Sequence, residues 1–225
     1  QVIAIDENPI KGQMVYQNLM ADMYIEGDLT TTLALLNTEL KNNIQQESSA
    51  IKERWLRNKN QHDKLEEQNR ISRTEAGKKT TIDPIFLCQT LSEIMPDNCV
   101  YVEETTSHRN TILQHVTWED PHRYIHPHGG LGQGLGLALG VKLAKLNQPV
   151  VALMGDGGLL YNPITQSFGV AGEANLPFLT IVFNNGNYEA MRRNHLHYYP
   201  DGEAFESGIF HGVHIPSPEY SELVA

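Results

Sequence analysis

Two short motifs in the second half of the chain could together hold a metal ion and a phosphate group. The triplet Gly-Asp-Gly at residues 155–157 follows the apolar run of residues 149–154. A pair of asparagines, residues 184–185, follows a second apolar run about two dozen residues later. Carboxylate and carboxamide oxygens are hard ligands of the kind that Mg²⁺ prefers, and glycines let backbone N–H groups approach a phosphate. The pattern therefore predicts a magnesium and phosphate site that includes Asp156 and Asn185.

A glycine-rich stretch, residues 129–140, suggests a nucleotide-binding loop at first sight. A dinucleotide fingerprint requires G-x-G-x-x-G directly after a buried strand. Here the glycine spacing does not fit, residues 119–128 lack a strand pattern, and no phosphate loop ending in Gly-Lys-Ser or Gly-Lys-Thr is present. Gly132, Gly136 and Gly140 instead recur every four residues. We interpret this spacing as one face of a helix that lacks side chains and allows close backbone packing. The sequence thus disfavours a nucleotide-binding oxidoreductase.

The motifs lie within an α/β pattern that extends over residues 81–225. Short apolar runs predict strands at residues 98–103, 149–154 and 176–183, with helical segments between them. Near-continuous apolar strands are typical of sheets that helices cover on both faces. We therefore expect an α/β fold with a doubly wound, mostly parallel sheet. Because ligands bind beyond the carboxyl ends of such strands, the two motifs should lie near each other.

Capping residues indicate where several helices begin. Asp83, followed by Pro84, is expected to cap one helix, and Asn162 before Pro163 is expected to cap another. Asp28 or Thr30 would cap a helix whose leucines recur at helical spacing.

The first 80 residues differ in composition from the rest. Residues 1–45 combine strand, turn and helix patterns, which predicts the closing elements of a separate α/β domain. Residues 46–80 hold few apolar side chains and many charges, which predicts a partly helical linker. Residues 221–225 have the pattern of a helix in progress, and the chain opens within an apolar run. We therefore expect a domain over residues 81–225 that is incomplete at its C-terminus, in a longer protein.

Composition disfavours several classes of partner. The chain has 17 Lys and Arg against 27 Asp and Glu, a net charge of −10, whereas binding to a nucleic-acid backbone requires clustered positive charge. No apolar run approaches the roughly 20 residues of a membrane span. The two cysteines, Cys88 and Cys99, exclude a disulfide framework and fit a reducing compartment. We expect a cytoplasmic protein without nucleic-acid or membrane partners.

Several motifs occur in an order that is known from one group of enzymes. Gly-Asp-Gly followed about two dozen residues later by Asn-Asn resembles the signature of enzymes that depend on thiamine diphosphate. Glu-Thr-Thr-Ser at residues 104–107, Gly-Gly-Leu-Gly at residues 129–132 and the strand and helix pieces of residues 1–45 resemble the acetolactate synthase and benzoylformate decarboxylase group. The resemblance covers nearly the whole chain. It implies the end of a central domain, a linker, and most of a diphosphate-binding domain over residues 81–225.

The resemblance implies a role for each motif position. Asp156 and Asn185 would bind Mg²⁺ through their side chains, and Asn187 through its backbone carbonyl. Leu131 would hold thiamine diphosphate in its bent form, and the carbonyl of Gly129 would accept a hydrogen bond from the aminopyrimidine. The other cofactor-binding positions would lie around the diphosphate: Thr106, Ser107, Gly155, Gly157 and Gly158.

The resemblance also implies the reaction, a decarboxylation or carboligation of a small 2-oxo acid whose identity stays open. The essential glutamate would come from a pyrimidine-binding domain outside this chain, usually that of a partner subunit. We therefore expect a homodimer or homotetramer, and an inactive isolated chain. His128, next to the glycine loop, is the candidate for a catalytic role. FAD could bind the central domain, although nothing in this sequence supports it, and a non-catalytic homologue or regulatory subunit is the alternative interpretation.

Overall fold

The computed structural model describes residues 1–10, 20–43, 49–216 and 219–220. It divides into two units, residues 1–64 and residues 65–225, which are considered separately below. The helix expected at residues 221–225 and the expected boundary between residues 45 and 46 both lie outside the described residues.

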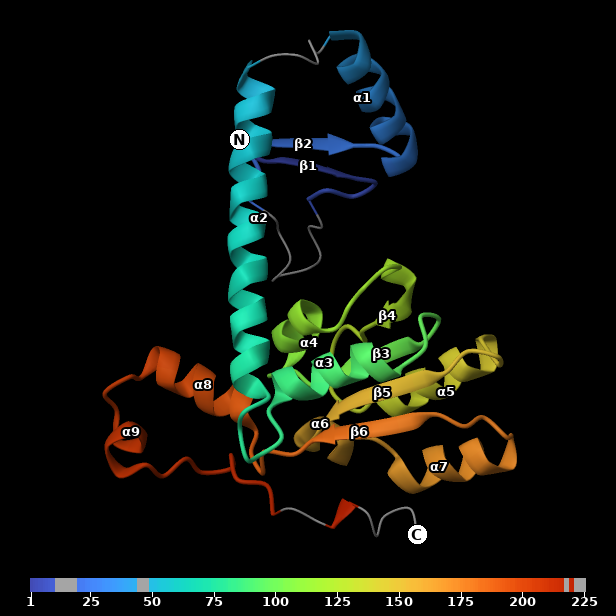
Figure 1. Ribbon diagram of the computed structural model, residues 1–225, viewed down its shortest axis with the longest axis vertical. Helices are drawn as coiled ribbons and strands as arrows, with labels where there is room; N and C mark the ends of the chain where they lie inside the picture. The colour runs from blue at the N-terminus through green and yellow to red at the C-terminus, as the bar shows by residue number, and fades with distance from the viewer. Residues whose placement is uncertain (11–19, 44–48, 217–218, 221–225) are drawn as a thin grey trace. The chain divides into compact units, whose positions relative to one another are not determined.

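The first unit is built on a pair of parallel strands. β1 (Ile3–Asp6) pairs with β2 (Met23–Glu26) in register, and α1 (Leu29–Asn43) follows (Figure 1). The carboxylate of Asp28 accepts a hydrogen bond from the N–H of Thr31 at 2.7 Å, which confirms Asp28 as the cap of α1. The expected strand and helix pattern is therefore present, while its assignment to a central domain stays a prediction.

The charged stretch forms one long helix, α2 (Ser49–Ala76). Ion pairs at helical spacing lie along it, such as Lys59 with Asp63 and Glu67 with Arg70. Its last turns belong to the second unit, where Arg73 donates a hydrogen bond to the carbonyl of Gln114. Most of the stretch from residue 46 to residue 80 is thus helical, while its role as a linker stays a prediction.

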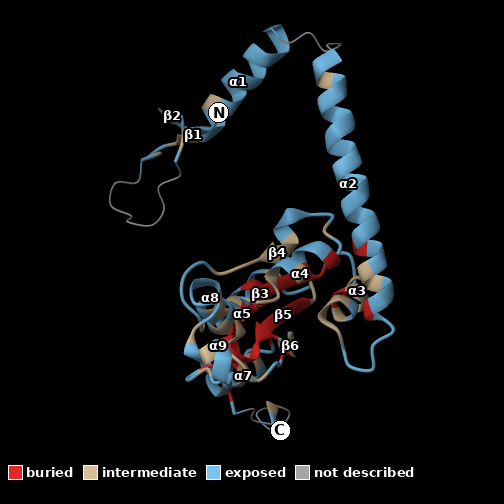
Figure 2. Cartoon of the chain, turned by 90° about the vertical axis from the view of Figure 1, so that its left-hand side faces the viewer, coloured by how far each residue is buried: buried red, intermediate tan, exposed pale blue. Residues whose placement is uncertain are grey.

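The second unit contains a parallel sheet of four strands in the order β4-β3-β5-β6, as expected for a doubly wound fold. Near its middle lie β3 and β5, every residue of which is buried (Figure 2). The strands are β3 (Val100–Glu104), β4 (Tyr124–Ile125), β5 (Val150–Gly155) and β6 (Leu179–Phe183). The predicted strands at residues 98–103, 149–154 and 176–183 are therefore confirmed to within a few residues.

Helices cover both faces of this sheet and complete two apolar cores. One core joins Cys88 and Leu91 of α3 (Pro84–Ile94) and Ile112 of α4 (Arg109–His115) to alternate residues of β3 and β5. The other joins α5 (Gly134–Ala144) and α7 (Ile164–Glu173) to the remaining residues of the same strands. The remaining helices of this unit are η1 (Pro121–Arg123), α6 (Asp156–Leu160), α8 (Glu189–Tyr198) and α9 (Glu203–Ser207).

Local features confirm some expectations and correct others. Asp83 caps α3 as predicted, and both cysteines are buried free thiols. The interpretation of the three glycines as a helix face for close backbone packing is wrong. Gly132 lies before α5 with a φ of 94°, and a side chain at Gly136 or Gly140 would meet open space. Within the described ranges, no helix combines the length with the apolar character that a membrane crossing requires.

Candidate functional site

A cavity of about 360 Å³ lies at the edge of the sheet where β3, β5 and β6 end. The strand register explains its position, because Gly155 pairs with Phe183 and the two motifs therefore begin side by side. Nine of the sequence-predicted site residues line this cavity: Thr106, Ser107, Leu131, Gly155, Asp156, Gly157, Gly158, Asn185 and Asn187. The fold thus brings together residues from four separate segments, which follow β3, precede α5, follow β5 and follow β6.

Asp156 connects the ends of the two neighbouring strands. Its side chain is buried, and its carboxylate accepts hydrogen bonds from the N–H groups of Gly157 at 2.8 Å, Gly186 at 2.7 Å and Asn185 at 3.2 Å. A carboxylate has about four lone-pair positions, so these three bonds leave capacity for a cation. Asp156 therefore has a structural role in addition to the metal role that the sequence suggests.

The asparagine motif forms a tight turn beside Asp156. The side-chain oxygen of Asn185 accepts a hydrogen bond from the N–H of Asn187 at 2.8 Å, and Gly186 has a φ of 66° that favours glycine. Among the described residues, no group of three or more His, Cys, Asp or Glu side chains could hold a metal ion. A cation here would therefore rely on Asp156, on neutral oxygens of this turn, and on ligand phosphates or water.

Two glycines after Asp156 are required by close packing. A Cβ atom at Gly157 would lie 2.6 Å from the ring of Tyr188, and one at Gly158 would lie 2.9 Å from the carbonyl oxygen of Glu104. Both glycines line the cavity, and the N–H of Gly157 already donates to Asp156. A diphosphate here would therefore lie against glycine backbone without an intervening side chain.

A smaller cavity of about 160 Å³ adjoins the glycine loop. Gly129 lines it together with Arg109 and His126, and Thr106 and Leu131 line both cavities. Leu131 therefore stands between the two spaces. His128 is exposed and lines neither cavity, and its ring contacts that of His126 at 5.5 Å between centroids. A catalytic role for His128 stays a prediction without support from its position.

Several aromatic residues that line the site, Tyr188 and His108 among them, were not predicted as site residues from the sequence. Tyr188 lines the main cavity and packs over Gly157, and its only signal was its place one residue after the asparagine turn. His108 lines the same cavity and stacks on Phe183 at 5.1 Å between ring centroids. Burial lowers the pKa of His108, and the charge of Arg193 lowers it further.

Glu103 is a buried carboxylate just behind the cavity. It accepts hydrogen bonds from the N–H and hydroxyl of Thr105 and from the hydroxyl of Tyr124, and Arg109 lies 3.2 Å away. Burial raises the pKa of Glu103, but these hydrogen bonds and the charge of Arg109 outweigh it and hold the pKa below its usual value. Both carboxylate oxygens are thus occupied within the protein.

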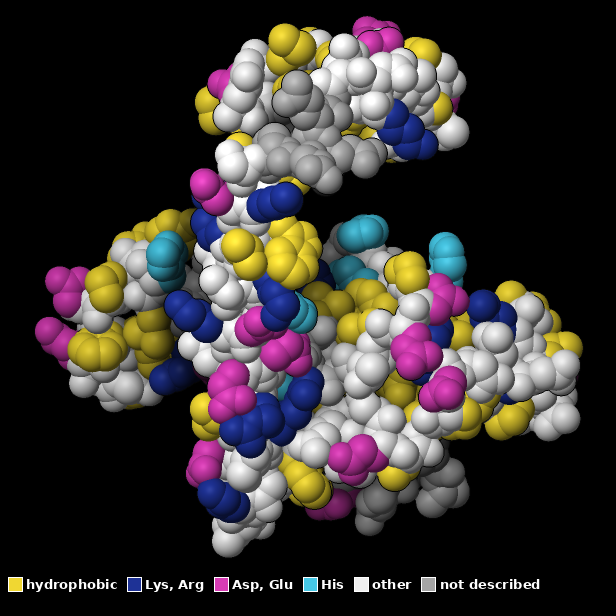
Figure 3. Space-filling view, turned by 45° about the horizontal axis from the view of Figure 1, so that its top comes forward, with side chains coloured by type: hydrophobic (Ala, Val, Ile, Leu, Met, Phe, Trp, Pro, Cys, Tyr) yellow, Lys and Arg dark blue, Asp and Glu magenta, His cyan; other side chains and the backbone are white. Residues whose placement is uncertain are grey.

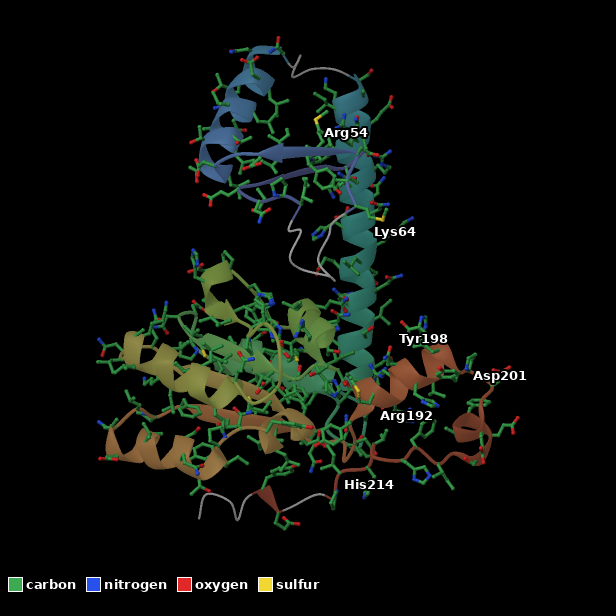
Figure 4. The ribbon with its side chains drawn as sticks, turned by 180° about the vertical axis from the view of Figure 1, so that it is seen from behind. Arg54, Lys64, Arg192, Tyr198, Asp201 and His214 are labelled. Atoms are coloured by element: carbon green, nitrogen blue, oxygen red, sulfur yellow. The ribbon has the colours of Figure 1, made fainter. Side chains whose placement is uncertain are left out.

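The segment after the asparagine turn folds back to close one side of the cavity. Arg192 on α8 places its guanidinium over the ring of Phe210 at 5.3 Å, and Figure 4 shows the positions of Arg192 and His214. His214 pairs with Asn187 in an isolated antiparallel bridge, and Gly212 lines the cavity. The bridge between Asn187 and His214 thus joins the asparagine turn to the segment that follows α9.

Comparison with known protein families agrees with this geometry. The model of the family described as "Thiamine pyrophosphate enzyme, C-terminal TPP binding domain" matches residues 104–221. Thiamine pyrophosphate (TPP) is the same molecule as thiamine diphosphate. The match begins at Glu104 and includes both strand-end motifs, the glycine loop and the segment that closes the cavity.

Individual proteins show the same similarity. Benzoylformate decarboxylase of Pseudomonas aeruginosa is 33% identical over 110 residues, which cover 48% of this chain and 20% of that protein. The mitochondrial acetolactate synthase catalytic subunit of Saccharomyces cerevisiae is 28% identical over 192 residues, covering 82% of this chain and 26% of that protein. The solved structure of a thiamine diphosphate-dependent 4-hydroxybenzoylformate decarboxylase from Rhodococcus jostii superposes with a TM-score of 0.57 at 28% identity, covering 65% of this chain and 26% of that one. The chain therefore spans about a fifth to a quarter of the length of these relatives.

Proposed function

This chain belongs to the thiamine pyrophosphate enzymes, and we propose that the protein decarboxylates or carboligates a small 2-oxo acid with thiamine diphosphate and Mg²⁺. The observation that carries this proposal is the gathering of Asp156, the asparagine turn and Leu131 around one cavity at the strand ends. When bound, the cofactor would supply the chemistry for breaking or forming a carbon–carbon bond next to a carbonyl, because it accepts the electron pair that the broken bond leaves behind.

The residues of the main cavity would bind the charged end of the cofactor. Asp156, Asn185 and the carbonyl of Asn187 would hold Mg²⁺, which neutralises the diphosphate. The backbone of Gly157 and Gly158 would approach the diphosphate oxygens, because Tyr188 and β3 leave no room for side chains there. Thr106, Ser107 and Gly155 line the same wall and would complete this part of the site.

The glycine loop would orient the cofactor's two rings. Leu131 lies between the two cavities, where an apolar side chain supports a bent molecule, and the carbonyl of Gly129 would accept a hydrogen bond from the aminopyrimidine. Holding reacting groups at a fixed separation accelerates their reaction by removing the entropy of encounter. These residues therefore act through position rather than through proton transfer.

The acid that activates the pyrimidine ring would come from a domain outside these residues, in a homodimer or homotetramer. Glu103 and Glu104 are unsuited to this role, because each already accepts several hydrogen bonds inside the protein. An isolated chain of residues 1–225 should accordingly bind the cofactor weakly and turn over no substrate.

Steady-state assays of the intact protein with thiamine diphosphate and Mg²⁺ test the proposal. Benzoylformate and pyruvate are the substrates to compare, with aldehyde release and acetolactate formation as the two readouts. Conversion of either 2-oxo acid that requires both cofactors supports the proposal. Tight cofactor binding without conversion of a wide panel of 2-oxo acids would overturn it in favour of a non-catalytic homologue.

A further inference from the structure

Glu104, the last residue of β3, places a buried carboxylate against the glycine loop. Its Oε1 accepts hydrogen bonds from the N–H groups of Gly132 at 2.7 Å and Gln133 at 3.1 Å. Its Oε2 accepts one from the N–H of Gly134 at 3.0 Å, and the side chain is only 4% exposed. Three consecutive backbone N–H groups at the start of α5 therefore have the same side chain, that of Glu104, as their hydrogen-bond acceptor.

Asn162 extends this connection to the turn that carries Asp156. Its amide nitrogen donates to Oε2 of Glu104 and to the carbonyl of Gly158, both at 2.9 Å. Its amide oxygen accepts a hydrogen bond from the N–H of Leu135 at 3.0 Å. The expectation that Asn162 caps the following helix is therefore wrong, because its side chain is engaged in these buried contacts instead. A fully paired buried polar network of this kind is rigid.

Close backbone packing restricts the same region. A Cβ atom at Gly132 would lie 2.6 Å from the carbonyl oxygen of Tyr161, and one at Gly134 would lie 2.8 Å from Oε2 of Glu104. The glycine loop therefore packs directly against Tyr161 at Gly132 and against Glu104 at Gly134.

We propose that Glu104, together with Asn162, is a positioning residue that fixes Leu131 relative to the Asp156 turn across the cavity. Leu131 directly precedes Gly132, whose N–H bonds to Glu104. The inference rests on the proposed function, because it assigns Leu131 to the cofactor's rings and the Asp156 turn to its diphosphate. Loss of the connection should therefore reduce turnover strongly and diphosphate binding weakly.

The neighbouring residue Glu103 provides a matched control. Both glutamates are buried at the end of β3, but successive side chains of a strand point to opposite faces. Glu103 bonds to Thr105 and Tyr124 and makes no hydrogen bond to the glycine loop within the described part of the chain. Glu103→Gln thus changes a buried carboxylate in the same way without touching the proposed connection.

Amide hydrogen exchange of the cofactor-free protein tests the connection itself. In Glu104→Gln the side chain keeps its size, but one oxygen becomes an NH₂ group that faces backbone or Asn162 donors. We expect exchange of peptides covering residues 130–136 to accelerate by about tenfold or more, with unchanged exchange in β5. Glu103→Gln should leave residues 130–136 protected. Equal acceleration in β5 and in the loop would indicate general destabilisation, and no acceleration in the loop would exclude the connection; either result overturns the proposal.

Kinetics of the intact protein test the functional part. We expect Glu104→Gln to lower kcat, expressed per bound cofactor, by about tenfold or more, while the Kd for thiamine diphosphate with Mg²⁺ changes by less than about threefold. An unchanged kcat, or a parallel loss of binding, would overturn the positioning role. Failure of the wild-type protein to bind thiamine diphosphate would instead overturn the proposed function, and the exchange result would still report on the connection.

A pair of substitutions at residues 104 and 162 tests whether the hydrogen-bond partnership of these side chains matters, rather than the total charge that they carry. Asn162→Asp alone places two carboxylates together and should accelerate exchange in the loop more than Glu104→Gln does. Glu104→Gln combined with Asn162→Asp restores the original charge and one donor–acceptor pair, so loop protection and kcat should recover part of their loss. Additive effects of the two substitutions would contradict a direct coupling between these residues.

Discussion

The two units of this chain differ in how they use apolar side chains. In residues 65–225, β3 and β5 are buried along their whole length and are covered by helices on both faces. In the described part of residues 1–64 no residue is buried, and hydrophobic side chains lie at the surface (Figures 2 and 3). The tryptophans show the same contrast, because Trp55 is exposed whereas Trp118 packs between Tyr101 and Tyr124.

This difference explains why the candidate site belongs to the second unit. Strands that are buried on both faces end at defined positions, so the loops that follow them place polar groups reproducibly. Asp156 directly follows β5, which is buried along its whole length, and the asparagine turn follows β6, which pairs with β5. The leucines of α1 have helical spacing, but none of them is buried among the described residues.

The largest effect is expected at the metal position. Asp156→Ala should weaken Mg²⁺-dependent binding of thiamine diphosphate by about a hundredfold or more, because it removes the charged ligand and also frees the asparagine turn. Isothermal titration measures the change. Asn185→Ala should weaken binding less, since a neutral oxygen contributes less than a carboxylate, and wild-type affinity in Asp156→Ala would exclude this site.

A smaller effect is expected at the apolar residue between the cavities. Leu131→Ala should lower kcat by about tenfold while cofactor affinity falls by less than about threefold, because the diphosphate contacts lie elsewhere. Turnover assays give kcat and isothermal titration gives the cofactor affinity, both on the same preparation. Equal losses of kcat and affinity would show that Leu131 only supports the loop.

The dependence of the free energy of unfolding on pH, measured at acid pH, should report on the ionisation of Glu103. Its pKa is lower in the folded state than in the unfolded state, so its contribution is present above about pH 4.3 and is lost as the pH falls through the folded value. Glu103→Gln should lower the free energy of unfolding at pH 7 by about 1–3 kcal/mol, and should flatten its decline below pH 4.3. Urea unfolding followed by tryptophan fluorescence measures both, and an unchanged pH profile would contradict the pKa assignment.

The smallest effect is expected in the first unit. Leu36→Gln on α1 should change the free energy of unfolding of the 225-residue chain by no more than about 0.5 kcal/mol, because this side chain is 45% exposed. Leu91→Ala, at a buried position of α3, serves as the reference and should cost about 2–5 kcal/mol. Similar losses of unfolding free energy in the two variants would contradict the difference in apolar burial between the two units.

The sequence predicted most of what depends on local pattern. Apolar runs located β5 and β6, and the polar residues directly after them indicated the site, because strand ends of a parallel sheet share one edge. Asp83 and Asp28 were found as caps since a cap acts within a few residues of itself.

Tertiary contacts decided the features that the sequence did not predict. Asn162 before Pro163 has the pattern of an N-cap, but its partner Glu104 lies 58 residues away. Gly132 has helical spacing with later glycines, yet it lies before α5 with a φ of 94° and packs against Tyr161 from another segment. Tyr188 packs its ring over Gly157, which lies 31 residues earlier, so its place in the site depends on the fold and not on local pattern. In each case a distant partner outweighed the local preference.

The central claim is that the cavity at the strand ends binds thiamine diphosphate through a magnesium ion. Titration of thiamine diphosphate into the intact protein, once with Mg²⁺ and once with EDTA, tests it most directly. We predict saturable binding with Mg²⁺ that is abolished by EDTA, and no binding of NAD under either condition. Equal binding of thiamine diphosphate in EDTA, or binding of NAD in its place, would contradict the claim.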